Sequence, residues 1–228
     1  VVPRDEVEQT HHRQRKENVS APEHAETYYP AGVASKVPRG RWTDPKIRAA
    51  LDKEWEKLRT HPWPKGALPK HCEKSKAKRG VWDDSLVQES SDVREWARKQ
   101  GITTHMGRLV EMCFEKGAEL QEGHPGRKFK GRAVFLGDNV KDQDWNYAVF
   151  DELGSAPPCM EASRCADAYS LFMGNICTAS DAISAYTQAF LKGLLTWVHI
   201  PEDRWPPEWK GKYAHPVCPL TLDLYGHP

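Results

Sequence analysis

Two stretches of residues decide the expected fold: THMGRLVEMCF at 104–114 and KFKGRAVFL at 128–136. Each stretch mixes apolar and polar side chains over a length typical of a β-strand. Glu115-Lys116-Gly117 predicts a turn, and residues 119–127 form a polar, glycine-containing segment typical of a loop. The two stretches therefore predict a β-hairpin with a long loop and with basic side chains along one edge.

A helix is expected before this hairpin, at about 44–59. Thr43 or Asp44 can cap its first turn, and Pro45 is favourable at the first helical position. The apolar residues that follow are spaced by four, four and three positions, which places them on one helix face: Ile47, Leu51, Trp55 and Leu58.

Two further helices are indicated by their boundary residues. Ser91 or Asp92, with Glu95 in the first turn, predicts a helix at about 91–100 that ends at Gly101. Pro157-Pro158 predicts the start of another helix, which continues through Phe172 and ends at Gly174.

Strands dominate the expected structure of the C-terminal part. Residues 176–180 predict a strand that ends at Asp181, and residues 182–192 are typical of a helix or a turn. Residues 194–200 (LLTWVHI) and 217–224 (VCPLTLDL) predict two more strands. Because helices and strands do not alternate regularly, the expected fold class is α+β.

The composition excludes several classes of protein. The chain has 228 residues and a net charge of +1. It contains no run of about 18 apolar residues, so no membrane-spanning helix and no membrane partner are expected. The polar N-terminus has no signal-peptide pattern, and the missing initiator Met predicts a piece of a longer protein. None of the six Cys forms a Cys-x-x-Cys pair, which favours a reduced, intracellular chain.

Charge and polarity divide the chain into three parts. Residues 1–40 lack apolar periodicity and are expected to be a disordered linker or tail. Residues 41–140 carry 21 basic and 15 acidic side chains, whereas residues 141–228 carry 6 and 11. This split fits either an uneven surface charge or a polyanion contact beside a carboxylate-lined site.

Short motifs taken one at a time identify no activity. His215-x-x-Cys218 has a spacing suited to a metal, but no second pair lies at zinc-finger distance. Asp83-Asp84 fits a helix cap or turn better than a Mg²⁺ site. Asp181 is the one charged residue between Asp167 and Lys192, so it is either buried with a partner or placed to bind a cation.

Six segments, taken in order, resemble the reverse transcriptase domain of copia-type retrotransposon polyproteins. Their family patterns are W-x-x-A-x-x-x-E-x-x-x-L, G-x-W, K-x-R-x-V followed by glycine, D-V-K-T-A-F-L-N-G, I-Y-M-x-Q-P and C-x-L-x-x-x-L-Y-G. The matching segments are 42–58, 80–82, 129–137, 181–193, 196–201 and 218–226. The final Gly226-His227-Pro228 resembles a variant of this domain found in dinoflagellate genomes.

The resemblance implies fingers at 41–150 and the first part of a palm at 151–228, together forming part of a right-hand polymerase fold. Such enzymes perform RNA-directed DNA polymerisation by two-metal nucleotidyl transfer, using Mg²⁺. Asp181 matches a family metal ligand and catalytic carboxylate, with the backbone of Ala182 beside it. Tyr186 matches the aromatic residue below the incoming sugar. Lys130 and Arg132 match cations that hold the triphosphate, for which an Arg fork is well suited.

The implied partners are an RNA or DNA template–primer and a dNTP, in cytoplasmic virus-like particles or in the nucleus; no oligomeric state is implied. The chain departs from the family in an insertion at 61–78 and in three extra residues before Leu191-Lys192-Gly193. The family's Tyr-x-Asp-Asp motif is expected beyond Pro228 and does not occur in the chain. Two alternatives therefore remain. One is a decayed or domesticated non-catalytic fragment that binds nucleic acid or protein, and the other is an unrelated α+β interaction domain.

Overall fold

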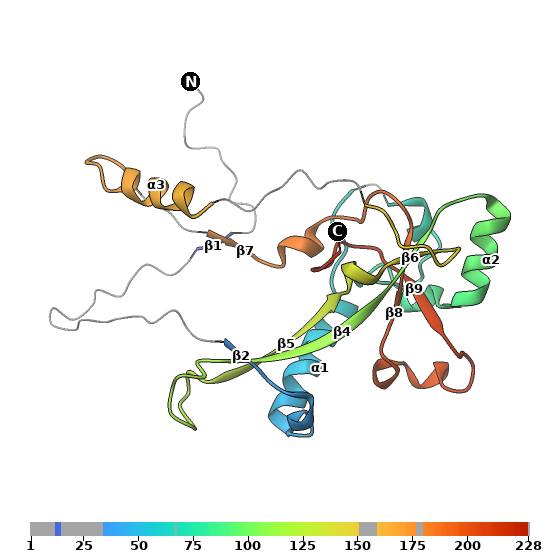
Figure 1. Cartoon of the computed structure of the whole chain (residues 1–228), viewed down its shortest axis with the longest axis horizontal. Helices are drawn as coiled ribbons and strands as arrows, with labels where there is room; N and C mark the ends of the chain where they lie inside the picture. The colour runs from blue at the N-terminus through green and yellow to red at the C-terminus, as the bar shows by residue number, and fades with distance from the viewer. Residues whose placement is uncertain (1–11, 15–33, 67, 151–158, 177–179, 228) are drawn as a thin grey trace. The chain divides into compact units, whose positions relative to one another are not determined.

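The computed structural model describes residues 12–14, 34–66, 68–150, 159–176 and 180–227 (Figure 1). The chain divides into two compact units. The described residues of the first unit lie within 12–14, 159–176 and 180–185, with residue 150, and those of the second lie within 34–149 and 186–227. The second unit thus joins most of the expected fingers to residues that the resemblance assigned to the palm.

The second unit is built around a seven-stranded mixed sheet. The strand order is β2-β4-β8-β9-β3, and β5 and β6 also pair with β4. The strands are β2 (Ala34–Lys36), β3 (Gln88–Glu89), β4 (His105–Lys116), β5 (Lys128–Phe135), β6 (Lys141–Asp142), β8 (Thr196–His199) and β9 (Pro216–Pro219). β4 and β8 are parallel, and the other pairs are antiparallel. With the helices below, this confirms the α+β class.

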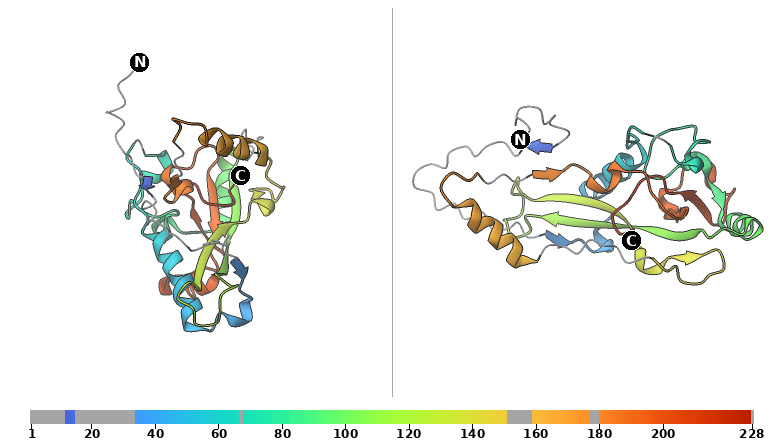
Figure 2. Two further views of the ribbon diagram at one scale, coloured as in Figure 1. Left: turned by 90° about the vertical axis from the view of Figure 1, so that its left-hand side faces the viewer. Right: turned by 90° about the horizontal axis from the view of Figure 1, so that it is seen from above.

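Helix α1 (Pro45–Arg59) begins and ends as predicted. The Asp44 carboxylate accepts a hydrogen bond from the Lys46 amide, and Pro45 needs no partner in the first turn. All four residues of the predicted apolar stripe are buried: Ile47, Leu51, Trp55 and Leu58. The helix lies against the β4–β5 hairpin (Figure 2).

The hairpin of β4 and β5 confirms the predicted pair of strands, and β4 runs two residues further than expected. Its register places Leu109 opposite Phe135 and Lys116 opposite Lys128, so the turn starts at Gly117. Gly131 lets α1 approach the strand closely, since a Cβ atom there would lie 2.5 Å from the Ala50 carbonyl oxygen. The glycine between the two basic residues of β5 therefore has a packing role.

Helix α2 (Ser90–Gln100) is one residue longer than predicted and ends at Gly101, whose φ of 63° is left-handed. The predicted cap at Ser91 or Asp92 is wrong. The residue before the helix is Glu89, and its carboxylate accepts hydrogen bonds from the backbone of Ala214 and His215 instead of capping α2. The Glu89 side chain at the start of α2 therefore binds the backbone at 214–215 and does not cap the helix.

The two strands predicted at 194–200 and 217–224 are confirmed in position, but both are shorter than predicted. β8 ends at His199, and β9 ends at Pro219. Beyond β9 the chain continues with isolated bridges, from Leu220 to Trp82 and from Leu222 to Phe190. The chain beyond Pro219 therefore makes strand-like bridges at Leu220 and Leu222, but these do not join β9 in one continuous strand.

Residues 34–37, expected to belong to the tail, join the sheet. β2 pairs with the far end of β4, and the Val37 amide donates to the Cys113 carbonyl. Val37 is buried with Ile47, Leu51 and Cys113, and this burial fixes a segment that has no apolar pattern of its own. Of the rest of the expected tail, the structure describes residues 12–14 and 38–40, and Arg39 and Gly40 enter the short 3-10 helix Arg39–Arg41.

The first unit contains helix α3 (Met160–Ser170) and a two-stranded antiparallel sheet of β1 (His12–Gln14) and β7 (Ser180–Ala182). α3 confirms the predicted helix, although its expected start at Pro157-Pro158 lies outside the described residues. Among the described helices, none has both the length and the apolar composition that crossing a bilayer requires.

Candidate functional site

The C-terminal segment 220–227 brings together motifs that lie far apart in the sequence. The Thr221 amide donates to the Val81 carbonyl over 2.8 Å, and the Phe135 amide donates to the Tyr225 carbonyl over 2.9 Å. The Leu191 amide donates to the Thr221 carbonyl over 3.0 Å. Four of the segments that carry the family resemblance therefore contact one another in the second unit.

Gly226 is required at this meeting point. Its φ is 90°, a left-handed conformation that favours glycine, and a Cβ atom there would overlap the Phe135 carbonyl oxygen. The neighbouring His227 packs its ring 5.0 Å from that of Phe135. Gly226 thus allows the backbone of the Leu224-Tyr225-Gly226 segment to pack closely against Phe135 at the end of β5.

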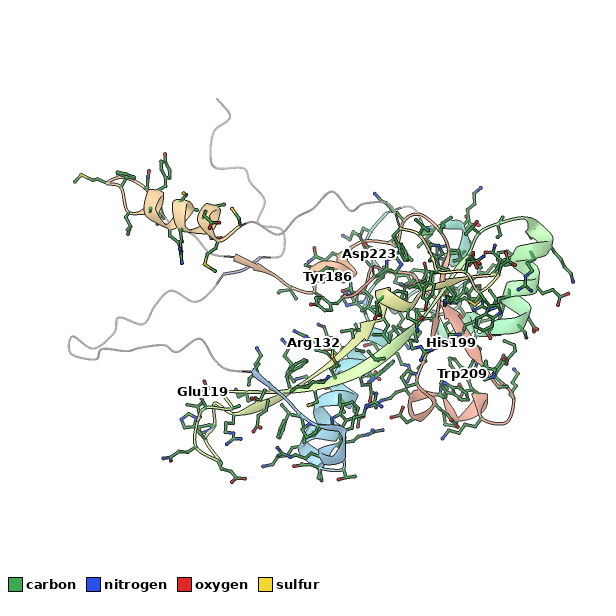
Figure 3. The ribbon with its side chains drawn as sticks, in the orientation of Figure 1. Glu119, Arg132, Tyr186, His199, Trp209 and Asp223 are labelled. Atoms are coloured by element: carbon green, nitrogen blue, oxygen red, sulfur yellow. The ribbon has the colours of Figure 1, made fainter. Side chains whose placement is uncertain are left out.

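Tyr225 of this segment and Tyr186 of the short 3-10 helix Ala185–Gln188 form an exposed aromatic pair. The rings of Tyr186 and Tyr225 meet edge to face, with centroids 5.4 Å apart, and the residues are 57% and 56% exposed. Asp223 lies close by along the chain, and its amide donates to the Ala189 carbonyl (Figure 3). Exposed aromatic faces held in this way can stack on a base or pack against a sugar.

Acid and imidazole groups interact around His227, which follows Tyr225 by two positions. Burial raises the pKa of Asp223, and His227 and Lys192 act in the opposite direction. Burial, followed by the charge of His227, lowers the pKa of His105, and Asp142 opposes this. The region is therefore polar and partly desolvated, which strengthens hydrogen bonds to a bound ligand.

The basic residues of β5 form the second half of the candidate site (Figure 3). Lys128, Lys130 and Arg132 alternate along the strand and share one side of it. Arg132 lies 3.6 Å from the Glu54 carboxylate of α1 and remains 41% exposed. Lys116 lies directly opposite Lys128, a pairing of like charges that is unfavourable without an anion.

The environment of Lys130 confirms that positive charge is crowded here. Its pKa is lowered by burial first and then by the charges of Arg132, Lys116 and Lys57, whereas Glu54 raises it. We call the group Lys57, Lys116, Lys128, Lys130 and Arg132 the basic cluster. A phosphate would relieve the mutual repulsion of these cations, so the basic cluster is suited to bind a polyanion.

The predicted metal ligand lies in the other unit. Asp181 and Ala182 belong to β7, and Asp181 is opposite Arg13 of β1 in the strand register. Tyr186, Lys130 and Arg132 lie in the second unit. The structure thus describes each group within its own unit, and the roles of Asp181 and Ala182 remain predictions.

The paired acids Asp83 and Asp84 have structural partners, as the turn interpretation predicted. The Ser85 amide and hydroxyl both donate to Asp83, at 2.9 and 2.6 Å. Asp84 accepts from the Trp82 indole over 2.8 Å and lies 3.0 Å from the Arg59 guanidinium. Burial raises the pKa of Asp84, and Arg59 opposes it.

The part of the chain that the structure describes contains no cluster of side chains suited to hold a metal ion. Within that part, no three His, Cys, Asp or Glu side chains are grouped so that they could hold an ion. Of the pair singled out by spacing, Cys218 is buried and lies 3.9 Å from Asp84, whereas His215 is exposed.

A buried ion pair, which no local pattern indicated, ties the second unit together. The Arg204 guanidinium binds the carboxylates of Glu111 on β4 and Asp52 on α1. The side chains of Arg204 and Glu111 are 8% and 4% exposed, while that of Asp52 is 53% exposed. This network fixes α1, and with it Glu54 and Lys57, relative to the sheet.

Lys130, Arg132 and Tyr186 are predicted as site residues by the sequence, whereas Tyr225, Lys116 and Lys57 were not predicted to be their neighbours. Lys116 was recoverable, because the hairpin register follows once the loop length is fixed. The position of Tyr225 depends on contacts with residues 39 and 90 positions away, so no local signal could have found it.

Comparisons of the chain with protein families, with curated proteins and with solved structures find no match.

Proposed function

We propose that the chain is part of a copia-type reverse transcriptase domain and that its second unit binds template–primer and nucleotide phosphates. The observation that carries the proposal is the basic cluster of α1 and the β4–β5 hairpin, with like charges left facing one another. The contacts among residues 80–82, Phe135, residues 189–191 and 221–225 support it further, because these segments carry the family resemblance.

In this proposal each side chain has a role that its surroundings suit. Arg132 retains free donors beside Glu54 and offers a planar fork to a phosphate. Tyr186, braced by Tyr225, excludes a 2′-hydroxyl from the space below the incoming sugar. The cations of β5 hold the phosphates, and the aromatic pair limits the shape of the sugar.

The proposal assigns binding, and not bond formation, to residues 1–228. Mg²⁺ would activate the attacking oxygen and neutralise the leaving pyrophosphate, with Asp181 as a ligand. Two such ions need about three carboxylates between them. The sequence has no Tyr-x-Asp-Asp, and the described residues contain no group of acids that supplies the others. This function implies an intracellular location, in cytoplasmic virus-like particles or the nucleus.

Fluorescence anisotropy of a labelled template–primer tests the proposal. Binding should weaken steeply with salt, since phosphate contacts release counterions. Reversing two charges, Lys130→Glu with Arg132→Glu, should remove most of the binding and flatten its salt dependence. The matched control is Lys210→Glu with Lys212→Glu, which changes the net charge equally at two exposed residues of another loop.

The control pair should bind within about twofold of the parent chain after correction for net charge. If both pairs of reversals weaken binding equally, the hairpin has no special role and the proposal fails. If binding does not respond to salt, the phosphate contacts that it invokes are absent.

A further inference from the structure

A second group of basic side chains lies on the α2 side of the sheet, away from the basic residues of β5. Val93 of α2 packs on Met106, Trp197 and Val217, which identifies the covered face. Arg108 and His199 follow Met106 and Trp197 by two positions, so they point to that same face. The register places Arg108 opposite His199 and His199 opposite Val217. His199 is labelled in Figure 3.

Further cations reach this position from two more elements. His215 precedes β9, and its carbonyl accepts from the Ser90 amide at the start of α2. Arg94, from the first turns of α2, is 4% exposed and donates to the Asp142 carbonyl. Its guanidinium lies 3.8 Å from the centre of the Trp145 ring, and its buried Nε has no hydrogen-bond partner among the described residues.

The electrostatics of His199 show that these groups face one another. Its pKa is lowered to about 4 by burial first and then by the charges of Arg94, Arg108 and His215. Of the described groups acting on it, Glu89 alone raises the pKa. The Glu89 carboxylate also accepts from two backbone amides, at 3.0 and 2.7 Å. Asp142 and Asp144 act on Arg94 and raise its pKa against burial, but around His199 two guanidinium groups face this one carboxylate.

We propose that Arg108, His199 and His215 form a binding site for a phosphate-type oxyanion, with Arg94 behind them. Such an anion accepts charge-assisted hydrogen bonds from the exposed Arg108 and from both imidazoles. It also reverses the field at His199, so that the ring takes up a proton when the anion binds. The ligand is either a free phosphate or a phosphate of a nucleic-acid backbone.

Sulfate is the first probe, because it stays a dianion across the pH range used and any pH dependence belongs to the protein. Calorimetric titration of the full chain between pH 8 and pH 5 should show tighter binding as the pH falls. The sulfate affinity should rise by up to about tenfold per pH unit for each proton taken up on binding. This rise is expected between the pKa of His199 in the free protein and its pKa in the sulfate complex. His199→Gln should reduce this gain, and Arg108 should still contribute to sulfate binding in that variant.

Arg108→Gln should weaken sulfate binding by about tenfold or more. The matched control is Arg98→Gln on the same helix as Arg94, since Arg98 is already held by Asp144 and by the Gln143 carbonyl. The control should bind sulfate like the parent chain. Spectra that report folding are recorded for each variant, so that a loss of binding is read only from folded protein.

A second arm identifies the source of the phosphate. If a short single-stranded oligonucleotide displaces sulfate and its own affinity falls in Arg108→Gln, the ligand is a nucleic-acid backbone. If inorganic phosphate displaces sulfate and the oligonucleotide does not, the site takes a free ion. Sulfate binding that does not saturate, or that is equal in Arg108→Gln, His199→Gln and Arg98→Gln, overturns the proposal.

Discussion

Replacing Arg204 by Met removes the cation from a buried ion pair and leaves the Glu111 carboxylate with 4% of its side chain exposed and its partner gone. An unpaired charge at such a site costs about 3–5 kcal/mol of the free energy of unfolding. Asp52, which is 53% exposed, stays solvated, so its separate loss through Asp52→Asn should cost less than about 1 kcal/mol. The difference between the two variants follows directly from burial.

Urea unfolding monitored by Trp fluorescence measures these values, and Trp55, whose ring centre lies 5.6 Å from the Arg204 guanidinium, reports locally. The decisive variant combines Arg204→Met with Glu111→Leu. Because it removes both charges, it should recover most of the loss and reach the stability of the parent chain or exceed it. A single Arg204→Met that costs under about 1 kcal/mol, or a double variant no more stable than the single one, would refute the reasoning.

Three further outcomes are expected. Residues 1–228 should incorporate no dNTP on a primed RNA template with Mg²⁺ or Mn²⁺, because Asp181 is the one family carboxylate in the chain, and polymerisation by this chain would contradict that reasoning. Asp181→Asn should leave the midpoint of urea unfolding nearly unchanged. Gly226→Ala should cost about 1–3 kcal/mol in urea unfolding, since its left-handed φ and the nearby Phe135 carbonyl both exclude a methyl group, whereas Gly123→Ala, also left-handed but open to solvent, should cost less. His199 stays neutral in the folded chain down to about pH 4, while in the unfolded chain it takes up a proton near pH 6.5. Stability should therefore fall by up to about 3 kcal/mol between those two values as the pH drops, and His199→Gln should remove that part of the slope; an unchanged slope in this variant would exclude His199 as its source.

Local signals predicted the elements whose structure depends on local residues. The stripe of Ile47, Leu51, Trp55 and Leu58 determines α1 whatever surrounds it, and the alternation along 128–135 does the same for β5. The prediction for the start of α2 was wrong because Glu89 is held by a backbone 125 residues away. β2 was missed because three residues without apolar pattern become a strand only by pairing with β4.

In the candidate site too, the residues of one strand were predictable from the sequence, and the contacts between distant segments were not. Lys130 and Arg132 were predictable because they alternate on one strand, and their neighbours follow from the hairpin register. The Tyr186–Tyr225 contact and the cations around His199 join segments far apart in the sequence, and each depends on the order of strands in the sheet. That order is set by the packing of the whole unit and not by any one stretch of residues.

The parallel pairing of β4 with β8 has a consequence for how the chain folds during synthesis. The half of β4 that pairs with β5 and β2 finds its partners within residues 34–135. On one edge His105 and Met106 then gain β6 at 141–142, whereas the other edge of 105–108 waits for β8, which ends at His199. At ribosomal speeds of about 5–20 residues per second, the 91 positions from Arg108 to His199 take about 5–18 s. During that interval the nascent chain presents an unpaired strand edge at Met106 and Gly107, which makes this edge the point where a chaperone would be needed most.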